Sequence, residues 1–230
     1  MKRNSNRAHP HRRLFISFVL ILFIGAAYTL GWSPAFSVKR VIVVGAPTNS
    51  ENEAIRTSVK LGDKLARIEP RALRETLHNF AWLGRSTVTR NWFNGTVTIR
   101  VWTRIPVARA DGELVDSGGH MFTLPGQESL ELPLIQATSS VARTFAVSLL
   151  NILPTEVRTS LISITADGSH SARLSTQMNI DGIPRPITII WGDQKNTELK
   201  GRVLKALLAL PENLEVKVVD VSAPHAPIVK

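Results

Sequence analysis

Hydrophobic residues fill the chain from Leu14 to Trp32, and this stretch contains no charged residue. As an α-helix with a rise of about 1.5 Å per residue, it would reach roughly 28 Å, which is close to the hydrocarbon thickness of a bilayer. Residues 1–13 before it contain five basic residues and no acidic one. Because basic flanks remain on the cytoplasmic side, the pattern predicts a single N-terminal transmembrane helix over 14–32, a cytoplasmic basic tail over 1–13 and an extracytoplasmic remainder.

Two other interpretations of the apolar stretch stay open at this point. A cleaved signal peptide would also carry a basic leader, and the small residues at 25–27 would suit its cleavage site. We favour the uncleaved anchor, because the apolar run continues beyond Ala27 to Trp32. A buried core helix is the third interpretation, but a helix that is hydrophobic all round at one end of the chain makes a poor core element.

Strand and helix patterns alternate in the next part of the chain, for which we predict a domain over 35–106. Asn94 and Gly95 favour a two-residue hairpin turn, because both positions of such a turn need positive φ. Pro106 marks the exit, since proline cannot donate to a strand ladder. The order β-α-α-β-β predicts a two-layer α/β module. Its expected elements are a strand at 37–45, a helix opened by a capping box at Ser50–Glu53, a helix opened by Pro70, and strands at 86–92 and 96–103.

Short strands and turns replace this pattern after Pro106, with helices expected at 141–153 and 196–210. A final strand over 215–221 leads into the proline-rich stretch SAPHAPIVK at 222–230, of which 225–230 is the C-terminal tail. A strand that comes last in a chain often lies at a sheet edge, where it can pair with a strand of another protein. The sequence therefore predicts an α+β protein whose second, mixed β-rich domain covers 107–224 and ends in an edge strand.

The composition excludes several classes of chemistry. The 230 residues contain no cysteine, so disulfides, thiolate metal sites and a cysteine nucleophile are excluded. The net charge is +10, and the basic leader before the apolar stretch is better explained by membrane topology than by nucleic-acid binding. No glycine-rich phosphate loop occurs, and the six histidines are scattered without the spacing of metal ligands. We expect no cofactor, no metal site, no catalytic residue, no nucleic-acid partner and no small-molecule substrate.

One short stretch imitates a catalytic signature. Asp116-Ser117-Gly118-Gly119 resembles the surroundings of a protease nucleophile, but no histidine lies in a recognisable partner motif. A hairpin turn explains the stretch better, since Asp and Ser favour turns and paired glycines supply positive φ. The nearby Asp111 and Glu113 are typical of solvated turn residues.

Basic and aromatic residues alternate on the two strands before Pro106. Arg90 and Trp92 lie on one strand, and Arg100 and Trp102 lie on the next. We expect the four side chains to share one face of the hairpin, either as a structural ladder or as a surface for a partner.

Several motifs occur in an order and spacing that resemble a known family. They are VKRVIVVG at 38–45, AWLGRSTVTRNWFNGTVTIRVWTRIPVA at 81–108, LVDSGGHMF at 114–122, LPLI at 132–135, WGD at 191–193 with a later lysine, and VVDVSAPHAPIV at 218–229. Together with the basic tail and the single span, they make the chain resemble the FtsQ/DivIB family of bacterial cell-division proteins over nearly its whole length.

The resemblance implies a POTRA domain over 35–106 and a non-enzymatic divisome scaffold in the cell membrane at the division septum. Such a scaffold recruits FtsB-like and FtsL-like partners and helps control septal peptidoglycan synthesis. The POTRA domain would use its sheet edge at 38–44 or its second helix around 71–79. The region of the last strand would bind the FtsB-like partner through Lys217, Val219, Asp220, Val221, Ser222, Ala223 and Pro224.

We predict that the partner binds by adding a strand at 215–221. Two other functions remain as alternatives. One is a POTRA-containing chaperone or secretion component, and the less favoured one is a membrane-anchored cell-wall hydrolase.

Overall fold

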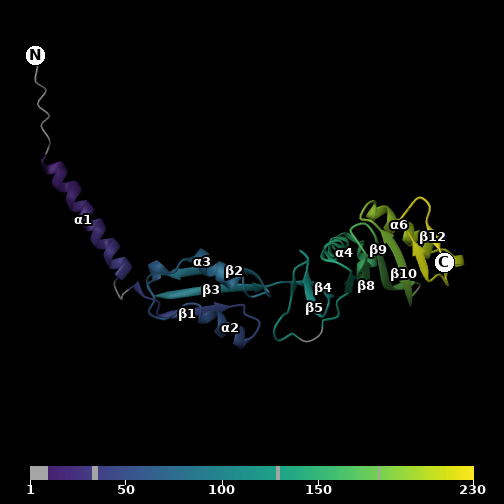
Figure 1. Ribbon diagram of the computed structural model, residues 1–230, viewed down its shortest axis with the longest axis horizontal. Helices are drawn as coiled ribbons and strands as arrows, with labels where there is room; N and C mark the ends of the chain where they lie inside the picture. Colours follow the sequence, from purple (N-terminus) through teal and green to yellow (C-terminus); the bar gives the residue numbers. More distant parts are fainter. Residues whose placement is uncertain (1–9, 33–35, 128–129, 181) are drawn as a thin grey trace, which may run out of the picture. The chain divides into compact units, whose positions relative to one another are not determined.

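The computed structural model describes residues 10–32, 36–127, 130–180 and 182–230. The chain divides after Thr103 into two compact units, residues 1–103 and 104–230. The apolar stretch lies in helix α1 (Pro10–Trp32, Figure 1). Among the described residues, no helix combines the length and the apolar character that a membrane crossing requires. The transmembrane helix over 14–32 therefore stays a prediction. The same holds for the domain boundaries predicted from the sequence, at residues 13, 32, 106 and 224.

The first unit has the predicted order of strands and helices after α1. Strand β1 runs parallel to β3, and β2 runs antiparallel to it, so the three-stranded sheet has the order β1-β3-β2 (Figure 1). The elements are β1 (Arg40–Val44), α2 (Asn49–Arg56), the 3₁₀ turn η2 (Leu65–Arg67), α3 (Pro70–Leu77), β2 (Leu83–Asn91) and β3 (Thr96–Thr103).

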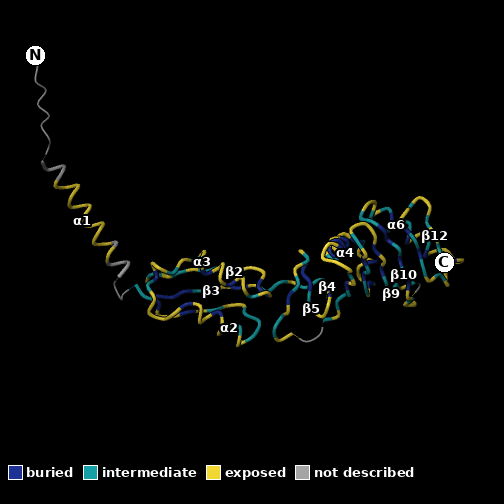
Figure 2. The backbone as a smooth tube through the Cα atoms, viewed as in Figure 1, coloured by how far each residue is buried: buried dark blue, intermediate teal, exposed yellow. Residues whose placement is uncertain are grey.

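Alternation along β3 divides the small sheet into a covered and a bare face. Val97 and Val101 are buried, as are Ile55 of α2 and Leu77 of α3 (Figure 2). Successive strand residues point to opposite faces, so Trp102, which is exposed, points away from this core. Both helices therefore cover one face of the sheet and leave the other face bare.

The predicted capping box of the first helix is wrong. Helix α2 begins at Asn49, and the Thr48 hydroxyl accepts a hydrogen bond from the Glu51 backbone N–H at 3.2 Å. Thr48 has the extended backbone of an N-cap residue, with φ −137°. Ser50 consequently lies inside the first turn instead of capping it.

The predicted two-residue hairpin turn is also wrong. Residues 92–95 separate β2 from β3, and of the two turn residues expected to have positive φ, only Gly95 does, at 70°. The Asn91 side-chain oxygen accepts the backbone N–H groups of Phe93 and Asn94 at 3.0 and 3.3 Å. This side chain takes over the role of a backbone turn, which makes a longer connection favourable.

The second unit is built on one mixed nine-stranded sheet with the order β12-β11-β10-β9-β8-β7-β4-β5-β6 (Figure 1). Its strands are β4 (Pro106–Ala110), β5 (Glu113–Asp116), β6 (Met121–Phe122), β7 (Leu134–Ala137), β8 (Leu161–Ala166), β9 (Ala172–Ile180), β10 (Ile183–Gly192), β11 (Val218–Asp220) and β12 (Ile228–Val229). Its helices are α4 (Ser140–Ile152), α5 (Thr155–Thr159), α6 (Thr197–Leu208) and the 3₁₀ turn η3 (Pro211–Asn213).

One hydrophobic cluster holds the second unit together. Leu149 of α4 and Leu204 of α6 belong to the same cluster as Leu174, Trp191 and Val219 from three strands of the sheet. Each of these five side chains is at most 1 % exposed. The mixed α+β class is confirmed for both units.

The last predicted strand is not at the sheet edge, which corrects the expectation for 215–221. Strand β11 pairs in parallel with β10 on one side and antiparallel with β12 on the other. The cause lies in the residues after β11, because Ser222 donates to the Asp220 carboxylate through its N–H at 2.9 Å and its hydroxyl at 2.6 Å. This turn starts a connection that brings Ile228 and Val229 back beside β11.

Candidate partner-binding site

The seven residues proposed for partner binding surround β11, but they do not form one exposed surface. Val219 and Val221 are 0 % exposed and belong to the hydrophobic cluster of the second unit. Lys217, Ser222 and Ala223 are exposed, and Asp220 and Pro224 are half-buried. The five residues that are exposed or half-buried could contact a partner through their side chains while the domain stays folded, whereas Val219 and Val221 could not.

Backbone groups beside β11 are occupied by the C-terminal residues of the chain. The N–H groups of Lys217 and Val218 donate to the Lys230 carbonyl, each at 3.0 Å, and the Lys230 N–H donates to the Val218 carbonyl at 2.9 Å. The pairing with β12 extends over only two register pairs, Val219 with Val229 and Asp220 with Ile228. A second strand can therefore reach β11 only by replacing this short segment.

The WGD motif at 191–193 and Lys200 of α6 hold the end of β10 beside β11. Lys200 of α6 is 1 % exposed, and its Nζ donates to the Asp193 carbonyl at 2.9 Å and to the Asp193 carboxylate at 2.8 Å. Gly192 has φ +72°, and a Cβ there would lie 2.8 Å from Ser222 Cβ. The motif thus lets the end of β10 approach the residues just after β11.

The pKa of Asp193 is lowered, chiefly because its carboxylate accepts the Lys200 hydrogen bond. Partial desolvation of the carboxylate acts in the opposite direction and raises the pKa. The hydrogen bond from the Lys195 N–H and the positive charges of Lys200 and Lys195 add to the lowering. The carboxylate therefore stays ionised at neutral pH and keeps the buried Lys200 paired, as a buried cation requires.

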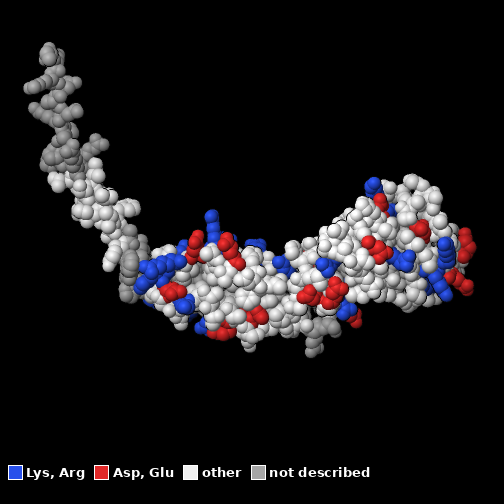
Figure 3. Space-filling model, viewed as in Figure 1, with Lys and Arg blue, Asp and Glu red and all other residues white. Residues whose placement is uncertain are grey.

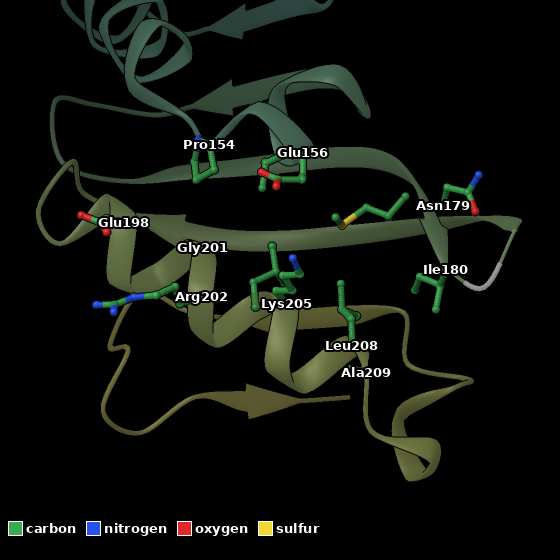
Figure 4. Close-up of a pocket in the computed structure, with 13 residues that line it drawn as sticks. Pro154, Glu156, Asn179, Ile180, Glu198, Gly201, Arg202, Lys205, Leu208 and Ala209 are labelled. Carbon is green, nitrogen blue, oxygen red and sulfur yellow. The ribbon is translucent and has the colours of Figure 1, made fainter.

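A cleft of about 570 Å³ opens in the second unit beside α6 (Figure 4). Val157, Met178, Leu204 and Leu208 give it an apolar lining. Gly201 lies where α6 meets Pro154, because a Cβ at Gly201 would be 2.7 Å from Pro154 Cγ. The volume falls in the range of about 300–1,000 Å³ that is typical of ligand pockets.

Charged residues of both signs line the same cleft. Figure 4 shows Glu156 across from Lys205, with Glu198 and Arg202 toward the other end. On the face of the second unit drawn in Figure 3, acidic and basic side chains are likewise interspersed. Sequence reasoning missed this cleft. The sequence predicted a helix over 196–210, but only the packing of α6 beside α5 and β9 makes a cavity along it.

The stretch that imitates a protease signature is a structural turn. Asp116 is 9 % exposed, and its carboxylate accepts Arg104 Nη1 at 2.6 Å and the backbone N–H groups of Gly118 and His120, both at 2.9 Å. Burial raises the pKa of Asp116, but these hydrogen bonds outweigh it and the net pKa is lowered. A carboxylate that accepts this many hydrogen bonds holds the turn in shape.

The four basic and aromatic residues of the β2–β3 hairpin do not share one face, contrary to expectation. Arg90 Nη1 donates to the carbonyls of Leu65 and Ile68 at 2.9 and 2.7 Å, on the helix side of the sheet. Arg90 is opposite Val97 in the register, and Val97 is buried. Arg100 and Trp102 point to the bare face instead.

An arginine guanidinium lies over the ring of each of the two tryptophans of the hairpin. Arg90 Cζ lies 5.2 Å from the centroid of the Trp92 ring, and Arg85 Cζ lies 4.8 Å from that of Trp102.

No group of three or more histidines, cysteines or carboxylates suited to a metal ion occurs in the described part of the chain.

Comparison with known proteins gives one consistent result. A cell division protein FtsQ from Mycobacterium leprae is 26 % identical over 234 residues, which cover 95 % of this chain. An FtsQ from Mycobacterium bovis is 24 % identical over 91 % of the chain, and one from Salinibacter ruber is 26 % identical over 55 %. The chain is thus similar to cell division proteins FtsQ over most of its length.

The similarity to FtsQ proteins has two limits. This chain spans 64 % of the length of the Mycobacterium leprae FtsQ, 66 % of the Mycobacterium bovis one and 52 % of the Salinibacter ruber one. No family model matches the chain. The similarity to FtsQ proteins therefore rests on identity spread along nearly the whole sequence.

Proposed function

We propose that this chain is a non-enzymatic bitopic membrane scaffold of the bacterial divisome, which recruits FtsB-like and FtsL-like partners and helps control septal peptidoglycan synthesis. The observation that carries the proposal is the similarity to an FtsQ protein over 95 % of the chain. The β-α-α-β-β order of the first unit supports its assignment as a POTRA domain over 35–106. The β-rich domain over 107–224 would supply the main partner-binding surface.

The proposed anchor is the segment 14–32. Figure 2 shows exposed residues along much of α1. The large apolar residues in the first half of the segment are exposed, from Leu14 at 67 % to Ile24 at 60 %. An apolar surface of this kind marks a membrane or a protein interaction site. With residues 1–13 in the cytoplasm, both folded units would lie outside it, at the septum.

Partner binding by simple addition to β11 is not compatible with the pairing of β12. We propose instead that a partner strand replaces β12 beside β11. The segment to be displaced is held by two register pairs and by the backbone hydrogen bonds of Lys230. Val229 packs against the hydrophobic cluster, but Ile228 is 53 % exposed, so only one apolar side chain of the segment has to leave the core. The partner would then contact Lys217 and Asp220 next to its strand, and Ser222, Ala223 and Pro224 beyond it.

Deletion of residues 225–230 separates replacement from addition onto β12. If the partner replaces β12, the deletion removes a competitor, and an FtsB-like segment should bind several-fold more tightly to the shortened chain. If the partner adds outside β12, the deletion should abolish binding. The exposed variant His225→Ala is the matched control, and its affinity should equal that of the unchanged chain.

Localisation tests the division role itself. A fluorescent fusion of the full chain, expressed in the bacterium that carries it, should form rings at mid-cell, and depletion should give filaments without septa. An even distribution around the envelope, with normal septation after depletion, would contradict the proposal.

A further inference from the structure

The small domain of the first unit has one end at which the chain enters it. Phe36 follows Trp32, the last residue of the proposed anchor, by four positions, and four residues span at most about 14 Å. Residues 60–64 lie at the same end, since the Val38 N–H donates to the Asp63 carbonyl at 2.8 Å. With the proposed anchor in the bilayer, this end of the domain lies within reach of the membrane surface.

The connection between β2 and β3 lies at this end too. The Lys39 N–H donates to the Gly95 carbonyl at 2.8 Å. The rings of Phe36 and Trp92 meet edge to face, with their centroids 6.4 Å apart. The Asn91 side chain accepts two backbone N–H groups of the connection, as described above. The connection is therefore held in a defined shape beside the residues that follow the proposed anchor.

Two apolar side chains are exposed at this end. Phe93 of the β2–β3 connection is 100 % exposed, and no large hydrophobic side chain in the described ranges is more exposed. Leu61, in the other connection at this end, is 64 % exposed. Single exposed apolar residues are common on protein surfaces. These two differ from the common case because the chain keeps them close to an apolar phase that they can enter.

Basic residues dominate the same end, which we call the anchor-proximal end and which consists of residues 36–40, 60–68 and 90–95. These three segments contain six basic residues and one acidic residue. In Figure 3, lysine and arginine side chains gather at the end of the first unit where β1 begins. An excess of positive charge beside exposed apolar residues is typical of surfaces that bind anionic lipids. The basic residues are Lys39, Arg40, Lys60, Lys64, Arg67 and Arg90, and the acidic residue is Asp63.

We propose that the anchor-proximal end is a membrane-contact surface for anionic phospholipids. Phe93 inserts among the lipid headgroups, and the ammonium and guanidinium groups around it bind the lipid phosphates. The small domain then rests on the bilayer in a fixed orientation beside its anchor. An acidic protein segment would match the charge, but the short chain between Trp32 and Phe36 keeps the bilayer itself at this end. The inference rests on the anchor proposed above, because that anchor brings this end to a membrane.

The full chain in lipid nanodiscs tests the contact through a fluorophore on a single cysteine. Because the chain contains no cysteine, Leu61→Cys supplies one unique site for labelling. A nitroxide on the lipid headgroups quenches a fluorophore that lies at the membrane surface. Quenching should be at least about twofold stronger in discs that contain phosphatidylglycerol than in discs of phosphatidylcholine alone, and added salt should weaken it.

Substitutions in the labelled chain give the second readout. Phe93→Glu should remove at least about half of the quenching, because it puts a charge where an apolar ring enters the headgroup layer. Lys39→Glu combined with Lys60→Glu should abolish the difference between the two lipid compositions, since both reverse exposed charges at this end. The matched control is Val44→Glu, at an apolar residue 44 % exposed at the other end of β1, and it should leave quenching unchanged.

Three outcomes would overturn the inference while the anchor stands. They are equal quenching in the two lipid compositions, undiminished quenching in Phe93→Glu, and an equal loss in Val44→Glu. Each would describe a domain that is tethered near the bilayer without binding it. A chain that does not stay with the discs would contradict the anchor and the membrane contact together. Mid-cell localisation tests the division role separately from all of these results.

Discussion

Two β-branched strands of this chain, β1 and β11, have similar sequences and opposite surroundings. Within the described part of the chain, RVIVV forms β1, which has a neighbouring strand on one side, whereas VVD forms β11, which has a neighbouring strand on both sides. Val44 of β1 is 44 % exposed, while Val219 of β11 is 0 % exposed. The strand sequences alone would not separate these two cases, because β propensity reports packing on a pleated surface and not edge position.

The difference arises from the direction that the chain takes after each strand. After β1, Gly45 adopts φ +93° against the Val101 carbonyl and the chain leaves for α2 on the covered face. After β11, the Asp220–Ser222 turn returns the chain, so β12 forms. Whether the edge of a strand is covered therefore depends on the path of the connection that follows it. Substitutions in and around β1 and β11 test this difference between the two strands.

The largest effect is expected at the end of β1. A Cβ at Gly45 would lie 2.2 Å from the Val101 carbonyl oxygen, whereas one at Gly62, with φ +90°, would meet open space. Gly45→Ala should therefore destabilise the first unit by about 3 kcal/mol or more, and Gly62→Ala by only about 1 kcal/mol for its backbone strain. Chemical denaturation of the two variants measures the difference. Equal losses would show that β1 is not held tightly against β3.

Lys200→Ala should have the next largest effect, because it removes a buried ion pair and leaves a cavity behind α6. We expect a loss of about 2–3 kcal/mol in the second unit, below the upper range for buried pairs because Asp193 is 35 % exposed. Lys205→Ala, an exposed position on the same helix, should change stability by less than about 0.5 kcal/mol. Similar values for both variants would contradict the role assigned to the WGD motif.

A paired valine truncation compares the two strands directly. Val219→Ala should cost about 2 kcal/mol because it empties part of a closed core, and Val44→Ala should cost less than about 0.5 kcal/mol. Thermal unfolding followed separately for each unit would report both changes. A large loss in Val44→Ala would mean that the β1 edge is covered in the protein and would remove the contrast.

The smallest effect concerns pH in the second unit. The folded pKa of Asp116 lies below its ordinary value of 3.8, so the folded state binds fewer protons than the unfolded state there. This carboxylate consequently adds stability above that pH, and the contribution disappears as the pH falls through the folded pKa. Asp116→Asn should lower stability by about 1 kcal/mol at neutral pH.

The difference between Asp116→Asn and the unchanged chain should narrow in acid. Unfolding curves recorded from neutral pH down to below the ordinary carboxyl value measure this trend. A difference that stays constant over that range would show that the hydrogen bonds from Arg104, Gly118 and His120 do not depend on the ionised carboxylate.

Much of the first unit could be predicted from local sequence signals. Pro70 opens α3 as expected, because its fixed φ and missing N–H suit the first helical position. The β-branched runs form β1 and β3 for the same local reason. Where a side chain competes with the backbone pattern, as Thr48 and Asn91 do, the boundaries shift by one or two residues.

The candidate site was less predictable. The sequence pattern placed a strand over 215–221, yet it could not reveal that Val219 and Val221 face the core or that Ile228 returns beside them. These facts depend on pairing between residues distant along the chain. The cleft beside α6 and the helix-side position of Arg90 have the same origin, since each depends on which elements pack together.

By itself, the sequence determined the order of strands and helices in the first unit, the absence of cysteine chemistry and the similarity to FtsQ proteins. These properties come from residues close together or from identity counted along the chain. Tertiary structure alone decided which strand edges are covered, which face of the small sheet is bare and where Lys200 finds its carboxylate. Each of these properties depends on hydrogen bonds and packing between segments that are distant along the chain, so it is decided only when the fold is assembled.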